Sequence, residues 1–142
     1  MELYTYIHIP RAPFRFSCTE RMLLLGSCFA ENIGTRLAGN KFNVDINPFG
    51  TLYNPASIAA ALRRLLHPER FTADDLLQHE GVYHSFSHHS RFSSTSETEC
   101  LRNINDRLEA STNEFRKTTY LVVTLGTAYV YRLKSSGEVV AN

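Results

Sequence analysis

Two short apolar runs, each ended by a glycine, constrain the fold of this chain most. Residues 22–25 are Met-Leu-Leu-Leu and precede Gly26, and residues 118–125 form a longer run that precedes Gly126. A continuous apolar run that ends in glycine is typical of a strand buried on both faces, as the strands of parallel sheets are. We therefore expect two such buried strands, one near each end of the chain.

Helical segments are predicted between these two strands. An apolar residue at every fourth position predicts a helix over 29–38, directly after the first glycine turn. Pro55 suits the first position of a second helix, because proline is well tolerated there. We further expect a short helix over 72–78 and a longer one from residue 96 onward.

The remaining segments are expected to be extended or irregular. Residues 42–46 alternate between apolar and polar side chains, which predicts a short strand. Residues 3–16 are interrupted by two prolines and predict an extended arm, and the Ser- and His-rich residues 81–95 predict an ordered loop with some extended structure. Residues 129–133 and 138–140 flank a Lys-Ser-Ser-Gly sequence, which is typical of a β-hairpin.

The order of these elements predicts the fold class. Strands that alternate with helices indicate an α/β fold with a parallel sheet and helices on both faces. The chain has 142 residues, which fits a single domain over 1–142. In such sheets the functional site lies at the carboxyl ends of the strands. We expect it at the turns 26–28, 47–50 and 126–128, each of which contains a glycine.

The composition excludes several functional classes. Lys plus Arg number 15 and Asp plus Glu 14, so a formal charge of +1 argues against a nucleic-acid partner. No apolar run approaches the roughly 20 residues of a membrane span, and no signal peptide is evident. Three cysteines without a Cys-x-x-Cys pair predict a reducing, cytoplasmic location. Neither zinc-ligand spacing nor a phosphate-binding loop is present, so we expect no metal and no cofactor.

Cys28 is the first candidate for chemistry. It lies in a predicted strand-to-helix turn, where the partial positive charge of the helix start favours the thiolate, the nucleophilic form of cysteine. The alternative is structural, with Ser27 or Cys28 filling a small gap behind the helix cap. The position in the sequence leaves both interpretations open.

Four short motifs lie along most of the chain. They are LLGSCFAEN at 24–32, NPFGT at 47–51, HSRF at 89–92 and TLGTA at 124–128. Together they resemble the motifs of the GSCFA family, which is grouped with the SGNH (GDSL-like) hydrolases. The resemblance implies a three-layer, flavodoxin-like α/β fold and esterase or acyl-hydrolase chemistry. It also implies that these residues are the N-terminal portion of a longer family domain.

The resemblance assigns roles to single residues. The nucleophile of the SGNH pattern falls on Cys28, with Ser27 as the rival, and the backbone N–H of Gly50 would help to bind the oxyanion. The third motif lacks its asparagine donor, because Ala128 stands there. The catalytic Asp and His of SGNH enzymes lie nearer the carboxyl end of the family domain, and His89 is the internal alternative to that base.

These roles lead to a functional prediction with two rivals. Asn47, Gly126 and Thr127 complete the predicted oxyanion and substrate site, and Arg91 either binds an anionic substrate group or pins its loop to an acidic neighbour. We predict an esterase or acyl transferase that acts on a small ester or an acylated carbohydrate. The first rival is a non-catalytic binding or assembly module of the same fold. The second is a homo-oligomer in which an exposed sheet edge pairs with another copy.

Overall fold

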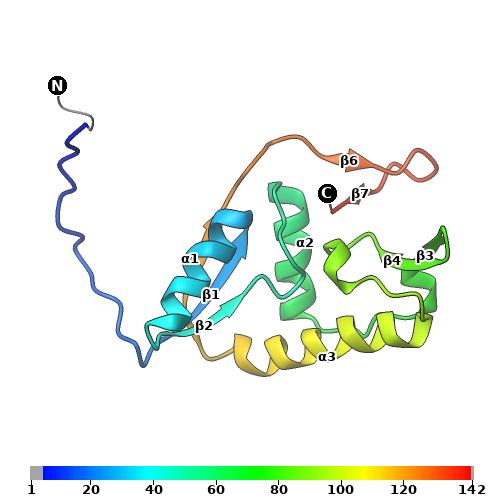
Figure 1. Cartoon of the computed structure of the whole chain (residues 1–142), viewed down its shortest axis with the longest axis horizontal. Helices are drawn as coiled ribbons and strands as arrows, with labels where there is room; N and C mark the ends of the chain where they lie inside the picture. Colours follow the sequence, from blue (N-terminus) through cyan, green and yellow to red (C-terminus); the bar gives the residue numbers. More distant parts are fainter. Residues whose placement is uncertain (1–4, 142) are drawn as a thin grey trace.

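The main sheet is small and parallel. The computed structural model describes residues 5–141. Its sheet contains β1 (Arg21–Gly26), β2 (Asn43–Ile46) and β5 (Thr118–Thr124) in the order β2-β1-β5 (Figure 1). Both pairings are parallel, and the strand order makes β1 the central strand. The predicted parallel sheet of an α/β fold is confirmed.

Three helices pack on this sheet. They are α1 (Cys28–Gly39), α2 (Pro55–Leu66) and α3 (Glu97–Phe115). Each begins after a residue whose side chain accepts a hydrogen bond from a backbone N–H of the first turn, namely Ser27, Asn54 and Ser96. Because such caps satisfy amides that the helix itself leaves free, they fix where a helix starts. The predicted helix starts are confirmed to within a residue.

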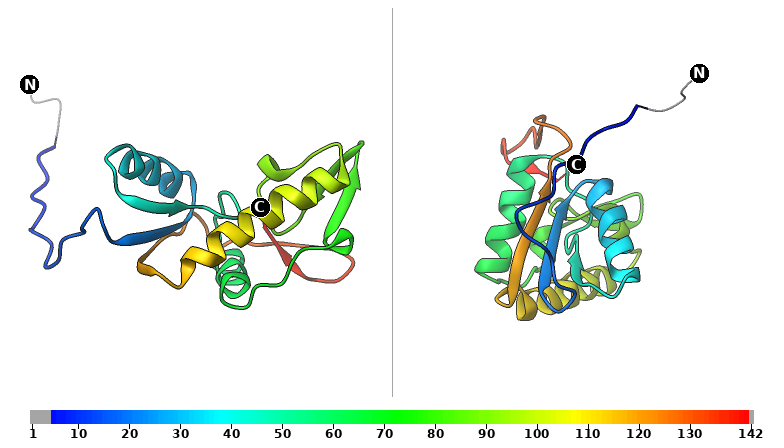
Figure 2. Two further views of the ribbon diagram at one scale, coloured as in Figure 1. Left: turned by 90° about the horizontal axis from the view of Figure 1, so that it is seen from below. Right: turned by 90° about the vertical axis from the view of Figure 1, so that its left-hand side faces the viewer.

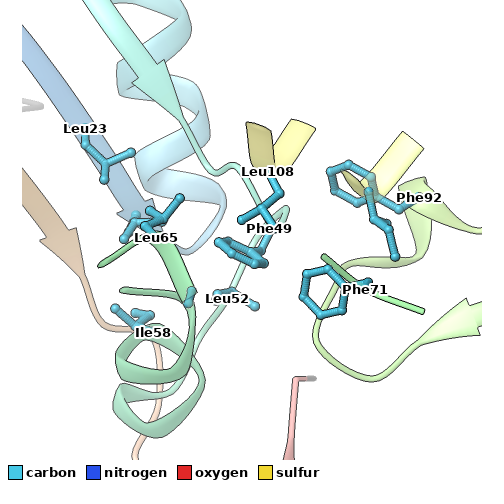
Figure 3. Packing of buried hydrophobic residues seen from close by; sticks show 11 residues of the cluster. Leu23, Phe49, Leu52, Ile58, Leu65, Phe71, Phe92 and Leu108 are labelled. Carbon is cyan, nitrogen blue, oxygen red and sulfur yellow. The ribbon is translucent and has the colours of Figure 1, made fainter. Parts of the chain in front are cut away.

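The two faces of β1 supply two separate hydrophobic clusters. Successive strand residues point to opposite faces of a sheet. Leu23 and Leu25 therefore pack in the larger cluster with α2 and α3, while Met22 and Leu24 pack against α1. Phe49, from the loop after β2, lies in the larger cluster between Leu23 on one side and Phe71 and Phe92 on the other (Figure 3). Helices thus cover both faces of the sheet.

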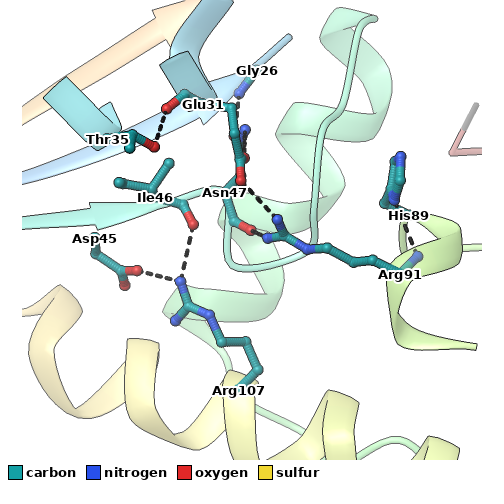
Figure 4. A network of polar contacts seen from close by, with 9 residues as sticks. All are labelled: Gly26, Glu31, Thr35, Asp45, Ile46, Asn47, His89, Arg91 and Arg107. Carbon is teal, nitrogen blue, oxygen red and sulfur yellow. Dashed lines mark hydrogen bonds and ion pairs between the residues drawn. The ribbon is translucent and has the colours of Figure 1, made fainter. Parts of the chain in front are cut away.

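An arginine of α3 ties that helix to the end of β2. The Arg107 guanidinium forms an ion pair with the buried Asp45 carboxylate and donates a hydrogen bond of 3.1 Å to the Ile46 carbonyl oxygen (Figure 4). A planar guanidinium can satisfy both groups at once. The contact holds α3 beside the strand end from which the second glycine turn departs.

The helix predicted over 72–78 is wrong. Only Ala73–Asp75 form a helical turn, η1, and the chain continues as β3 (Leu76–His79), which pairs antiparallel with β4 (Val82–Ser85). The connection is the two-residue loop Glu80-Gly81, both with positive φ, which is the geometry that a tight hairpin requires. The predicted loop over 81–95 accordingly contains one regular strand and the short helix η2 (Ser90–Phe92).

The expectation that β5 is buried on both faces is also wrong. Its residues alternate between half-buried and exposed, and Leu121 and Val123 are 48% and 41% exposed. Tyr120 and Val122 pack on the α1 side, whereas no β5 residue belongs to the cluster under α2 and α3. The reason is that β5 is an edge strand of this sheet, and α2 and α3 pack on β1 instead.

The two ends of the described chain agree with the sequence. The hairpin is present as β6 (Tyr131–Arg132) and β7 (Val139–Val140), which pair antiparallel. Residues 5–16 form no helix or strand and make an extended arm (Figures 1 and 2). The arm meets the sheet at Phe16, whose ring centroid lies 4.8 Å from that of Tyr120. In the described part of the chain, none of the helices has the length and apolarity needed to cross a membrane.

Candidate functional site

The three glycine turns meet at the carboxyl ends of the strands. The Gly26 N–H donates to Asn47 Oδ1 at 2.9 Å, and the Leu52 N–H donates to the Gly26 carbonyl at 2.8 Å. The Gly126 N–H donates to the Tyr53 carbonyl at 2.8 Å. The loop after β2 is therefore hydrogen-bonded to both of the other turns, and the predicted convergence is confirmed.

The first turn exposes a thiol at the start of α1. Cys28 is the first residue of the helix, and its side chain is exposed. Its N–H is one of the amides that a helix start leaves free, and it has no hydrogen-bond partner among residues 5–141. Ser27 caps the helix, since its Oγ accepts from the Phe29 N–H at 3.3 Å and lies 3.3 Å from Thr124 Oγ1. The Ser27 hydroxyl oxygen is thus engaged in a helix cap, whereas the Cys28 thiol is exposed.

Gly26 is required by the close approach of β1 and β5. Its φ is +141°, a value that side chains rarely permit. A Cβ atom at this position would lie 2.1 Å from the Thr124 carbonyl oxygen. The same carbonyl accepts the Ser27 N–H at 3.3 Å, so the turn is held directly on the end of β5.

A polar network joins the second turn to α1 and to the HSRF motif. Asn47 is fully buried with φ of +42°, and its Nδ2 donates to Glu31 Oε2 at 2.9 Å (Figure 4). Arg91 binds Glu31 Oε1 at 2.8 Å and donates to the Asn47 carbonyl at 2.7 Å. Of the two predicted roles of Arg91, this geometry is that of pinning its loop to an acidic neighbour. The Asn47 side chain is likewise occupied by the fold.

The other predicted substrate-binding amides are also engaged. The Gly50 N–H, the expected oxyanion donor, donates to the Asn47 carbonyl at 2.8 Å. The N–H groups of Gly126 and Thr127 both donate to the Tyr53 carbonyl, at 2.8 and 3.1 Å. In this conformation none of the three is free to bind a substrate oxygen.

His89 lies against the second glycine. Gly50 has φ of +83°, and a Cβ atom on it would stand 2.2 Å from His89 Cβ. The His89 N–H donates to the Phe49 carbonyl at 2.9 Å, and its Nδ1 accepts from the Arg91 N–H at 3.1 Å. The histidine is half-buried, and its Nε2 has no hydrogen-bond partner in the part of the chain that the structure describes.

The neighbouring histidines anchor the loop. Nδ1 of His84 lies 2.9 Å from Ser93 Oγ, and Nδ1 of His88 lies 2.9 Å from Ser85 Oγ. His88 is buried among the rings of three phenylalanines, and this burial lowers its pKa to about 3. Within residues 5–141 no group of three or more metal-ligating side chains is close enough to hold an ion.

A hollow of about 510 Å³ opens beside His89. It lies between the loop after β2 and the β3-β4 hairpin, and its lining includes Tyr53, His84, Phe86, His89 and Ser90. Tyr53 also packs against the third turn, because a Cβ on Gly126 would lie 2.9 Å from its ring. The hollow therefore adjoins the turns at the strand ends.

The family model of the GSCFA family matches residues 21–142. The chain belongs to the GSCFA family. Searches of curated proteins and of solved structures gave no match.

In this GSCFA chain the Gly-Ser-Cys-Phe-Ala sequence at 26–30 is a structural unit as well as part of the candidate site. Gly-Ser-Cys-Phe-Ala spans the end of β1, the helix cap and the first turn of α1. The motif at 24–32 contacts each of the other three motifs, because Gly26 binds Asn47, Glu31 binds Arg91 and Ser27 binds Thr124. His89 also contacts the motif at 47–51, through Phe49 and Gly50. Glu31 and Tyr53 also belong to this site, but the sequence gives no signal for them, because their roles depend on contacts between distant segments.

Proposed function

We propose that this GSCFA protein is an SGNH-like hydrolase that uses Cys28 to transfer or hydrolyse an acyl group. The observation that carries the proposal is the exposed thiol at the first position of α1, next to its own free N–H, where the three turns meet. A helix start favours negative charge, and therefore favours an oxyanion beside the thiol. The three-layer arrangement of the SGNH fold is part of this proposal.

The proposed reaction has two steps. The Cys28 thiolate attacks the carbonyl carbon of an ester, a carbon–sulfur bond forms, and the carbonyl oxygen takes the negative charge. The intermediate collapses with cleavage of the carbon–oxygen bond, and the alkoxide leaves with a proton as the alcohol. Water then cleaves the thioester to a carboxylic acid and regenerates the thiol. A second alcohol in place of water gives acyl transfer instead of hydrolysis.

The hollow beside the turns supports the substrate class that we propose. Its lining combines hydroxyl and imidazole groups with the rings of Tyr53 and Phe86. Such a surface suits a hydroxyl-bearing group such as an acylated carbohydrate, which offers both hydrogen bonds and apolar faces. The described lining residues and the +1 charge of the chain favour neither nucleic acid nor a membrane surface as the partner.

The experiment compares three single variants with the wild type on 4-nitrophenyl acetate. We expect Cys28→Ala to abolish turnover and the acetyl-enzyme seen by mass spectrometry. Ser27→Ala loses a helix cap, which is worth about 1 kcal/mol, but retains acetylation. Cys18→Ala is the matched control, because Cys18 is an exposed cysteine that precedes the amino end of β1, whereas Cys28 follows its carboxyl end.

Three results contradict the proposal. If Cys28→Ala still forms the acetyl-enzyme and Ser27→Ala does not, the nucleophile is Ser27. If acetylation maps to Cys18, the reaction is adventitious. If the folded wild type neither turns over nor becomes acetylated with any simple ester, the protein is a binding or assembly module of this fold.

A further inference from the structure

The candidate site has fewer free oxyanion donors than acyl transfer requires. Enzymes of this chemistry place preorganised donors around the oxygen that becomes negative. Here the Cys28 N–H is free, but the N–H groups of Gly50 and Gly126 are engaged by carbonyls. The Asn47 side chain is bound to Gly26 and Glu31, and Ala128 has no side-chain donor. A second donor must come from elsewhere.

His89 has a free donor, as its contacts show. Its Nδ1 accepts the Arg91 N–H, and an amide can act only as the donor in that bond. A neutral imidazole whose Nδ1 is an acceptor carries its proton on Nε2. The Nε2–H of His89 is therefore a hydrogen-bond donor, and no residue in the described chain accepts from it.

The contacts of this segment hold His89 against the second glycine turn. On one side, the His89 Cβ fills the space that a side chain on Gly50 would need. On the other side, Arg91 is bound to Glu31, which lies in the first turn of α1 three residues after Cys28. The segment from His89 to Arg91 thus spans from the second glycine turn to the helix that bears the thiol.

We propose that His89 donates a hydrogen bond from Nε2 to the substrate oxygen that becomes negatively charged, in the place of the absent asparagine. The role rests on the proposed function. It assigns a donor and not a base: the imidazole keeps its Nε2 proton while sulfur adds to the carbonyl carbon, and the proton for the leaving alkoxide comes from another source, such as water. Gly50 is then required because any side chain there would displace this ring.

The first test is the tautomer of His89, which does not depend on activity. A long-range ¹H–¹⁵N correlation spectrum of the labelled chain at neutral pH distinguishes a protonated from an unprotonated ring nitrogen, and the His89→Gln spectrum identifies the signals. We expect a neutral ring with Nδ1 unprotonated and Nε2 protonated. The opposite tautomer overturns the proposal, because Nε2 would then be an acceptor suited to a base.

The second test is a matched pair of substitutions. Asn places its amide where His has Nδ1, so His89→Asn keeps the acceptor for the Arg91 N–H but does not reach the Nε2 position. Gln places its amide nitrogen near the Nε2 position, so His89→Gln retains the donor. We expect His89→Asn to lower kcat about 10²- to 10³-fold with little change in KM, and His89→Gln to recover most of that loss. His67→Ala removes an exposed histidine at the end of α2 and is expected to match the wild type.

The outcomes separate this role from the proposed function. If the wild type is active and both variants lose activity equally, together with the acidic limb of the pH profile, His89 is a base and the donor role is refuted. If both variants retain full activity, His89 has no part in the reaction. A folded wild type that neither turns over nor is acetylated refutes the proposed function, and this role with it. Thermal unfolding of each variant verifies that the folds compared are intact.

Discussion

Acidification is expected to destabilise this protein through one buried histidine. His88 is 8% exposed and packs against the rings of Phe49, Phe71 and Phe92. Burial, followed by the positive charge of Arg64, lowers its pKa from 6.5 to about 3. Between these two values the unfolded chain binds a proton that the native protein does not bind. Lowering the pH therefore favours the unfolded state.

The magnitude follows from the two pKa values. Well above pH 6.5 both states are neutral at His88, and the histidine contributes no pH dependence. From about pH 7.5 to pH 5 the free energy of unfolding is expected to fall by about 2 kcal/mol from this group alone. The loss continues towards pH 3, where the native histidine also becomes protonated.

The assay is urea unfolding at several pH values for the wild type and for His88→Phe. Phenylalanine fills the aromatic site without a titrating group, although it gives up the contact with Ser85 Oγ. We expect the difference in unfolding free energy between the two proteins to shift by about 2 kcal/mol in favour of the variant on acidification. His67→Ala is the control for removal of an exposed histidine. Parallel pH profiles of the wild type and His88→Phe would refute the reasoning.

Two further substitutions test the packing of the site and the core. Gly50→Ala is expected to lower the free energy of unfolding by at least about 2 kcal/mol, because a left-handed backbone and a 2.2 Å approach to His89 Cβ both oppose a side chain there. Gly137 has φ of +74° but open space around it, so Gly137→Ala is expected to lower it by only about 1 kcal/mol. Equal melting temperatures of the two variants would contradict this prediction. Asn105→Ala is expected to cost about 2–4 kcal/mol in urea unfolding, because its buried amide pairs with both the N–H and the carbonyl of Phe71; a loss below 1 kcal/mol would contradict it.

Local signals predicted the elements whose ends are set by neighbouring residues. The start of α1 follows from the cap at Ser27, and the start of α2 from Asn54 and Pro55. The prediction of a helix over 72–78 was wrong because two local signals compete there. Acidic residues after a threonine suit a helix start, whereas the Glu80-Gly81 turn, which directly follows β3, favours a hairpin. A short segment with competing signals is decided by the partner strand that the turn supplies.

The accessibility of β5 could not be read from its sequence. An apolar run predicts that a strand packs on both sides, but the run does not say which helices lie above it. In this structure α1 covers one side and no helix covers Leu121 and Val123 on the other. Position within a sheet is a property of strand order, and strand order is set by pairing between distant segments.

The sequence by itself determined the strands of the parallel sheet, the helix caps and the meeting of three glycine turns, because propensity, capping and the topology of parallel sheets act through residue type and order. Only the tertiary structure decided which polar groups remain free at that meeting point. It occupies the amides of Gly50 and Gly126 and the side chain of Asn47, and it leaves the Cys28 amide and His89 Nε2 without partners in residues 5–141. The Gly126 amide and the Asn47 side chain are engaged by segments far apart in the chain, and such hydrogen bonds exist only once the fold has brought those segments together.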